Sequence, residues 1–279
     1  MIKNIIKLVM VFCLLFFVME FAEAAKNNGE SIVFPIILET DPPCEEMMAR
    51  RAQLEQMDPE KDQSDIVRFV KDEDEDIITR RIAAEKINDQ SVLAELAHNN
   101  SETGVRVIAT WKLNDQNHLA IIATNDIARQ VRSAATVKLE DQTLLVKIAT
   151  NEAEENEVRS YAIQKLKNQE LLEKIVLNNT NSYLRVMAAM TLKDKTLLVD
   201  LATTGEEVQL RQMATARIDD QKIVAQIAKT DVDEQVRYTA VFCLNDQSLL
   251  AELAKNSNDK EVRQIAMSKL DDLNKRANQ

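Results

Sequence analysis

The sequence contains very little glycine and proline. Only three of its 279 residues are glycine, and no proline follows Pro59. Globular proteins contain about 7% glycine on average, and β-rich and Rossmann-type folds depend on glycine and proline in their turns. This composition argues against both fold classes. It favours helices that are joined by short polar loops.

Residues that usually carry chemistry are also scarce. The chain has three cysteines and two histidines, and no cysteine or histidine pair stands at the spacing of a zinc site. It contains no glycine-rich phosphate loop, G-x-S-x-G or H-E-x-x-H motif. We interpret His98 and His118 as surface or packing residues without a partner that the sequence can place. We therefore predict no catalytic residues, no metal or cofactor, and no enzymatic activity.

Positive charge is in deficit, since 35 Lys and Arg residues stand against 46 Asp and Glu residues and give a net charge of −11. Binding to a nucleic-acid backbone needs many cationic contacts. The charge therefore argues against a nucleic-acid partner.

One apolar run stands near the start of the chain, from Leu8 to Met19. Lys3 and Lys7 precede it, and Ala22 and Ala24 follow it in an A-x-A arrangement. As a helix this run would span about 18 Å, whereas a bilayer core is about 30 Å thick. We therefore interpret residues 1–24 as a cleaved signal peptide rather than a membrane anchor. The expected location is periplasmic or secreted, with no membrane span after cleavage.

A repeat dominates the rest of the sequence. Its pattern is VRxxAxxKLxDQxLLxxIAxN, with steps of 26 residues and a single step of 27. Eight copies in one register indicate a repeat architecture. The arginines of the pattern are Arg80, Arg106, Arg132, Arg159, Arg185, Arg211, Arg237 and Arg263.

Each copy predicts two short helices. Val236, Ala240 and Leu244 lie on one face of the first helix, and the leucine pair at Leu249 and Leu250 begins the apolar face of the second. Helices this short are marginal alone and must stack to bury these faces. The sequence thus predicts an all-α fold, an α-solenoid of about eight two-helix repeats.

The V-R-x-x-A start, the aspartate at the turn and the Leu-Leu-x-x-Leu-Ala second helix resemble HEAT-like repeats, and the short period resembles leucine-rich variant repeats. The resemblance covers about residues 62–273. It implies an α-solenoid but no particular activity. The period is shorter than that of a HEAT repeat, so a different curvature is implied. The cysteine cluster of some leucine-rich variant proteins is absent, so no iron–sulfur role is implied.

The predicted organisation has four parts. Residues 1–24 form the signal peptide, residues 25–61 a leader with one helix at about 43–57, residues 62–273 the solenoid, and residues 274–279 a tail. Ser31–Thr40 is apolar, and a strand, a linker and an ordered cap all remain open for it. A disulfide between Cys44 and Cys243 is permitted by export but is not expected.

Two polar rows follow the repeat. The arginines form one row, and an acidic row recurs nine residues later and also supplies predicted N-caps of the second helices. We interpret the two rows as a structural Arg–Asp ladder, and an arginine-lined groove for an anionic ligand is the alternative. The acidic row consists of Asp89, Asp115, Asp141, Asp194, Asp220 and Asp246.

A third row lies in the last turn of the first helices, where cations favour the negative helix end. It consists of Lys86, Lys112, Lys138, Lys165, Arg217 and Lys269. We interpret it as helix-end capping or, alternatively, as a partner-binding row. Trp111, Tyr161 and Tyr238 also lie on the first helices. We interpret them as packing residues, and for Trp111 and Tyr238 a role as partner anchors is the alternative.

The function that these features favour is an exported scaffold that binds a protein partner along its first helices. The cationic row predicts an acidic contact surface on that partner. A HEAT-like-fold enzyme of the lyase type and an envelope structural protein without a defined ligand are the alternatives.

Overall fold

The computed structural model describes residues 45–277, which contain 17 helices and no strand. The predicted signal peptide, the Ser31–Thr40 segment and Cys44 lie outside the described residues. The helices are α2 (Glu45–Gln56), α3 (Gln63–Lys71), α4 (Ile77–Lys86), α5 (Gln90–Asn99), α6 (Thr103–Lys112), α7 (Gln116–Asn125), α8 (Arg129–Lys138), α9 (Gln142–Thr150), α10 (Asn156–Lys165), α11 (Gln169–Asn178), α12 (Ser182–Thr191), α13 (Lys195–Thr204), α14 (Val208–Ala216), α15 (Gln221–Thr230), α16 (Glu234–Cys243), α17 (Gln247–Asn256) and α18 (Lys260–Ala277).

The turns within repeats form as the sequence predicts. The Asp89 carboxylate accepts hydrogen bonds from the backbone N–H groups of Ser91 at 2.8 Å and Val92 at 3.1 Å. The other five aspartates of the acidic row cap α7, α9, α13, α15 and α17 in the same way. Each cap satisfies N–H groups that the first helical turn leaves without a partner.

Apolar side chains at the repeat positions form the core. Val236, Ala240 and Leu244 of one copy are fully buried. Of the leucine pair, only the second residue is fully buried: Leu250 is inaccessible, whereas Leu249 is half-buried. The apolar face of the second helix is therefore narrower than the sequence predicts.

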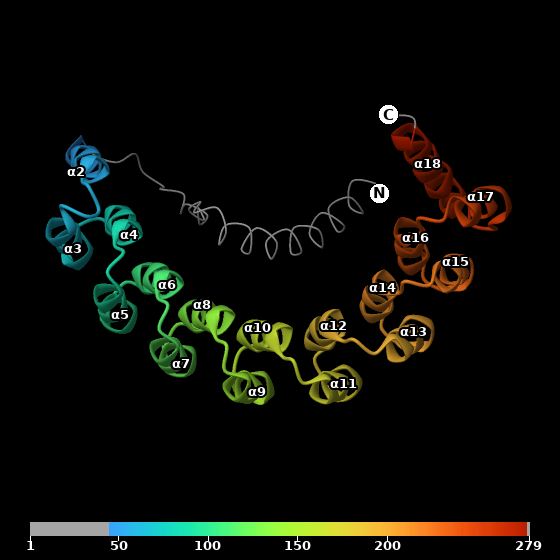
Figure 1. Ribbon diagram of the computed structural model, residues 1–279, viewed down its shortest axis with the longest axis horizontal. Helices are drawn as coiled ribbons and strands as arrows, with labels where there is room; N and C mark the ends of the chain where they lie inside the picture. Colours follow the sequence, from blue (N-terminus) through green and yellow to red (C-terminus); the bar gives the residue numbers. More distant parts are fainter. Residues whose placement is uncertain (1–44, 278–279) are drawn as a thin grey trace. The chain divides into compact units, whose positions relative to one another are not determined.

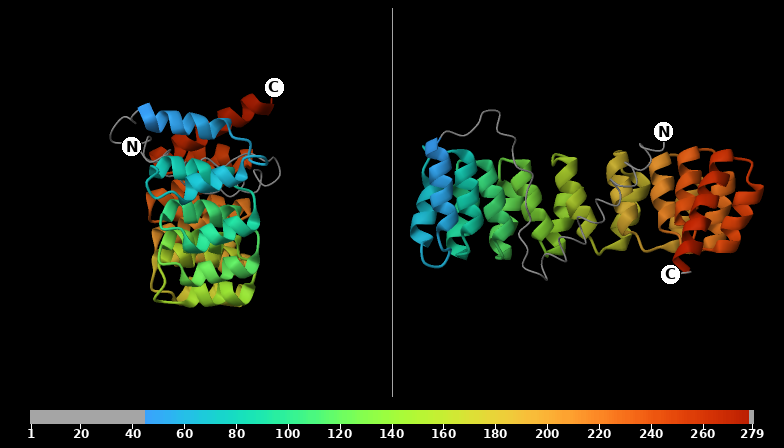
Figure 2. Two further views of the ribbon diagram at one scale, coloured as in Figure 1. Left: turned by 90° about the vertical axis from the view of Figure 1, so that its left-hand side faces the viewer. Right: turned by 90° about the horizontal axis from the view of Figure 1, so that it is seen from above.

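Residues Arg51–Gln279 form one compact unit. Within this unit the helices form two layers. The first layer holds the even-numbered helices from α4 to α18, and the second layer holds the odd-numbered helices from α3 to α17 (Figure 1). Helices of both layers lie side by side across the direction of the array (Figure 2).

Packing differs between the layers. Neighbouring even-numbered helices pack against one another along the whole array, whereas α5 and α7, like α13 and α15, touch very little. The first layer accordingly follows the inner side of the row in this unit (Figure 1). All-helical architecture and the repeat of two helices per 26 residues are thus confirmed.

The ends of the array differ from the sequence prediction. The compact unit begins at Arg51 rather than at residue 62, because Arg51 donates to Asp76 at 2.7 Å and Lys86 donates to the carbonyl of Glu55 at 3.2 Å. At the other end α18 continues to Ala277 instead of fraying after residue 273. No glycine or proline interrupts this segment.

Candidate interaction surface

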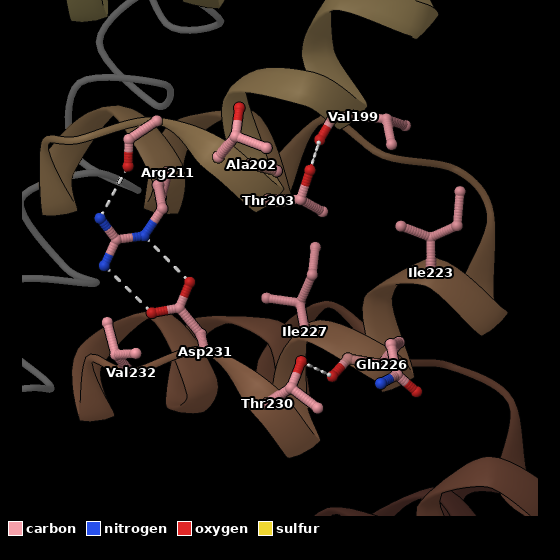
Figure 3. A pocket seen from close by; sticks show the side chains of 12 residues that line it. Val199, Ala202, Thr203, Arg211, Ile223, Gln226, Ile227, Thr230, Asp231 and Val232 are labelled. Atoms are coloured by element: carbon pink, nitrogen blue, oxygen red, sulfur yellow. Dashed lines mark hydrogen bonds and ion pairs between the residues drawn. The ribbon is translucent and has the colours of Figure 1, made fainter.

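The arginine row joins consecutive repeats. Arg106 donates from Nε and Nη2 to the two carboxylate oxygens of Asp126 at 2.9 and 3.1 Å, and from Nη1 to the Asn100 carbonyl at 3.0 Å. Arg211 has the same arrangement with Asp231 and the Gly205 carbonyl, as Figure 3 shows. Each arginine therefore ties the loop before its own helix to the loop of the next repeat.

The predicted pairing of this row with the acidic row is wrong. The acidic row lies at the turn after the first helix, while the arginines lie at the start of that helix, near the opposite loop. Their acidic partners are loop residues, including Glu154 for Arg132, Glu207 for Arg185 and Asp259 for Arg237. Arg80 and Arg159 donate from Nε to carbonyls of Val70 and Ala149, and Arg263 donates to the Ser257 carbonyl. Because these guanidinium groups are engaged, the arginine-lined groove is not supported.

Each member of the lysine row caps the C-terminal end of a neighbouring helix instead of the helix to which it belongs. Lys138 donates to the carbonyls of Trp111 and Leu113, at the end of α6. The other members of the row likewise donate to backbone carbonyls at or just after the C-terminal end of the preceding even-numbered helix. These members are Lys86, Lys112, Lys165, Arg217 and Lys269. Burial lowers the pKa of Lys112 and Lys269. The row therefore caps helices of neighbouring repeats, and the alternative that it is a cationic binding surface is not supported.

A glutamine row was missed, although the recurring Asp-Gln dipeptide marks it. Gln90 donates from Nε2 to the Lys112 carbonyl at 3.1 Å and accepts at Oε1 from the Asn114 N–H at 2.8 Å. Gln116 and Gln142 repeat both bonds one copy further on. The side-chain amide thus binds the turn of the next repeat and adds to the stacking interface.

Aromatic side chains gather on the first layer. Among residues 45–277, every Trp, Tyr and Phe except Phe69 belongs to an even-numbered helix. Tyr183 and Phe242 are 48% and 45% exposed, and Trp111 is half-buried. Tyr238 is only 7% exposed, so its ring packs inside the array as interpreted from the sequence, and the alternative that it anchors a partner is not supported.

We define the inner stripe as the first-layer residues that lie two before, two after or five after the arginine of each repeat, positions that share one face of the helix. It includes Trp111, Val137, Tyr161, Gln164, Tyr183, Met187, Met190 and Phe242. The Tyr183 hydroxyl donates to the Ser160 hydroxyl at 3.2 Å, and Gln164 lies 3.6 Å from the sulfur of Met187. The stripe is therefore closely packed between α10 and α12.

Charge on this face is sparse and negative. Glu85, Glu157 and Glu261 occupy equivalent positions of other turns, and the neighbouring Arg81 is paired with Glu102. The lysines at the edge of the face are used as caps. The expectation of an acidic partner surface therefore loses its basis.

A groove of about 450 Å³ opens between α13 and α15 in the second layer (Figure 3). Val199 and Ala202 line one wall, and Ile223 and Ile227 line the other. The hydroxyl groups of Thr203 and Thr230 donate to carbonyls of their own helices. The groove therefore presents mainly apolar walls, with the Arg211–Asp231 pair at its end.

The structure also joins two residues that the sequence leaves apart. His98 Nε2 and His118 Nδ1 are 3.0 Å apart, and the two rings meet edge to face with centroids 5.2 Å apart. They bridge α5 and α7. The sequence alone could not place this contact, because it joins two different repeats.

Searches of protein-family models and of curated proteins found no match. Among solved structures the chain is similar to one described as "a leucine-rich repeat variant with a novel repetitive protein structural motif". The sequences are 22% identical, the TM-score is 0.52, and the match covers 75% of this chain and 83% of the other. This likeness concerns the fold, and it confirms the resemblance to short helical repeats. Along residues 45–277, no helix has both the length and the apolar character to cross a membrane.

Proposed function

We propose that this protein is an exported scaffold without enzymatic activity, and that it binds a polypeptide partner along the inner stripe. The observation that carries the proposal is the position of the aromatic residues. They concentrate in the first layer, where Tyr183 and Phe242 are about half exposed. Many other positions of the repeat are occupied by core residues, by helix caps or by the arginines that join the loops. Repeat arrays commonly bind partners on such extended inner surfaces.

The chemistry of the stripe indicates what the partner presents. Aromatic and methionine side chains provide apolar contact area, and Tyr and Trp are frequent binding hot spots. The acidic residues on this face are Glu85, Glu157 and Glu261, and Glu157 lies 3.6 Å from Nε of Arg129. We therefore expect an apolar polypeptide segment with basic residues beside it, since complementary charge favours the correct partner.

Export is part of the proposal and is supported by the basic start, the short apolar run and the A-x-A site of residues 1–24. The intact mass of protein purified from its natural source tests it. We expect a mature chain that begins at Ala25 or a neighbouring residue. A cytoplasmic protein that retains Met1 would contradict export while leaving the binding surface untested.

Site-specific photocrosslinking tests the binding surface. A photoreactive phenylalanine analogue is placed at Tyr183, at Phe242 or, as a control, at Leu177, which is 55% exposed on the second layer. We expect one and the same protein to be crosslinked from the two stripe positions and not from Leu177. Equal crosslinking from Leu177, or none from the stripe, would contradict the proposal and favour a lyase-type enzyme or a structural protein without a defined ligand.

The purified partner then permits a quantitative test. Tyr183→Ala and Trp111→Ala should each weaken binding by about ten-fold or more, as expected of hot-spot aromatics. Leu177→Ala should leave the dissociation constant unchanged. Circular dichroism of all three variants checks that the helical array persists.

A further inference from the structure

The only two histidines of the chain are brought into contact by the fold. Packing alone does not require them. The position of His118 is aliphatic in the other complete repeats: Val92, Leu144, Leu171, Leu197, Ile223 and Leu249. The position of His98 holds Thr124, Thr150, Leu177, Thr203, Lys229 and Lys255. Two imidazoles have thus replaced residues that serve the same places in the array elsewhere.

The geometry of the pair suits a shared ligand atom. The facing nitrogens, His98 Nε2 and His118 Nδ1, are 3.0 Å apart, and the centroid separation of 5.2 Å places both nitrogens between the rings. Two nitrogen ligands of a tetrahedral zinc ion, each at 2.0–2.1 Å, stand about 3.3 Å apart. The two nitrogens now point at each other, so both rings must tilt and their nitrogens separate by about 0.3 Å before both lone pairs face one ion. Both residues are half-buried, so solvent reaches the pair.

We propose that His98 and His118 together form a chelating site for a divalent transition-metal ion that imidazole binds well, such as Zn²⁺, Ni²⁺ or Cu²⁺, across α5 and α7. Among residues 45–277, no group of three or more His, Cys, Asp or Glu side chains is placed to hold a metal ion. Water therefore completes the coordination. The site has two protein ligands and open coordination positions, unlike a structural zinc site with four protein ligands.

Proton balance is simple. In the hydrogen-bonded pair one imidazole donates its N–H to the other ring. On metal binding that proton moves through solvent to the outer nitrogen of the same ring, and both facing nitrogens present lone pairs to the ion. Both rings stay neutral, so the neutral pair releases no proton.

The position of the pair between two helices supports the same conclusion. Because α5 and α7 touch very little otherwise, an ion held between them would add a cross-link to the second layer.

The test uses the full chain purified without a histidine tag. Zn²⁺ is titrated calorimetrically, and Cu²⁺ is followed by electron paramagnetic resonance. The variants His98→Thr and His118→Leu introduce residues that occupy the same positions in other repeats, so both are expected to fold. The matched control is Lys229→Thr, which removes the Lys229–Glu252 ion pair of 2.8 Å between α15 and α17.

We expect one ion per chain, a copper spectrum with two nitrogen ligands, and binding that is at least about ten-fold weaker in each histidine variant, because even an outer-shell partner of a metal ligand is worth that much. Lys229→Thr should bind as the unaltered chain does. Absence of binding, a spectrum with oxygen ligands only, or unchanged affinity in His98→Thr would overturn the proposal. The copper spectrum of the unaltered chain decides the question even if a variant fails to fold.

Discussion

Two equivalent buried arginines, Arg106 and Arg159, bind the neighbouring loops in different ways. We call the contact between one even-numbered helix and the next a step of the array. Arg106 holds Asp126 through two hydrogen bonds and also caps the loop carbonyl of Asn100. Arg159, equally buried, donates from Nε to the Ala149 carbonyl at 3.2 Å, and no carboxylate within residues 45–277 pairs with it. Asp126 follows Arg106 by 20 residues, and the residue that follows Arg159 by 20 residues is Asn179.

The difference shows how the repeat separates stability from recognition. A buried guanidinium without a carboxylate is costly, so the step from α10 to α12 should be less stable than the steps around Arg106 and Arg211. The same step carries Tyr161 and Tyr183 of the inner stripe. Binding surfaces commonly lie in the less stable parts of a fold. The comparison therefore links the weaker step to the proposed partner surface.

Acid should produce the largest effect, because several carboxylates that cap helices or bind arginines have a lowered pKa. Hydrogen bonds from Ser91 lower the pKa of Asp89, and those from Ser248 and Leu249 lower the pKa of Asp246. Burial opposes ionisation of Asp259, but hydrogen bonds from Arg237 and backbone N–H groups outweigh it and lower the pKa. Carboxylates with a lowered pKa stabilise the fold above the unfolded value of about 3.9, and this contribution is lost as the pH falls through the folded pKa.

We therefore expect the array to lose helical structure as the pH falls below about 4. Hydrogen exchange should show α16 losing protection more than α10, because Arg237 of α16 depends on the Asp259 carboxylate, whereas Arg159 of α10 depends on a carbonyl. Circular dichroism that stays unchanged down to pH 2 would contradict the importance of these carboxylates.

Removing one carboxylate that binds a buried arginine should produce the next largest effect. Asp231→Ala leaves Arg211 buried without its carboxylate and should cost about 3–5 kcal/mol. The control is Asn179→Ala at the equivalent position, which removes the acceptor of the Asn181 N–H and should cost about 1 kcal/mol. Urea unfolding followed by hydrogen exchange measures both, since repeat arrays need not unfold in one step. Equal costs would show that the two steps do not differ.

The period, the helix pairs and the aspartate caps could be predicted because each depends on residues close in sequence. The acidic partners of the arginines could not, because they lie in loops of differing composition: Asp126 follows Arg106 by 20 residues, whereas Glu154 and Asp259 follow Arg132 and Arg237 by 22 residues. The cap made by Lys138 reaches the previous repeat, and His98 meets His118 only because α5 and α7 are neighbours in the second layer. Contacts between copies depend on stacking geometry, which the repeat pattern does not contain.

Reversing a cap lysine should have an intermediate effect. Lys138→Glu loses the hydrogen bonds to the carbonyls of Trp111 and Leu113 and places a negative charge at the negative end of α6. We expect a loss of about 2 kcal/mol. Lys167→Glu is the control, because this exposed loop residue undergoes the same change of charge. If both variants unfold at the same urea concentration, Lys138 does not cap, and the lysine row returns as a candidate binding surface.

The smallest expected effect is a gain. Asn179→Asp places a carboxylate at the position from which Asp126 and Asp231 bind their arginines, and it should stabilise the step around Arg159 by about 1 kcal/mol. Asn151→Asp is the matched control, since Arg132 already has Glu154 as its partner at 2.8 Å. Hydrogen exchange should therefore slow in α10 to α12 for the first variant and stay unchanged in α8 and α9 for the second. If Asn179→Asp slows exchange and also weakens partner binding, although no residue of the inner stripe is altered, the lower stability of this step serves recognition. If exchange slows and binding is unchanged, the weaker step is independent of the partner surface; if exchange is unchanged, the absence of a carboxylate beside Arg159 does not explain the difference between the two steps.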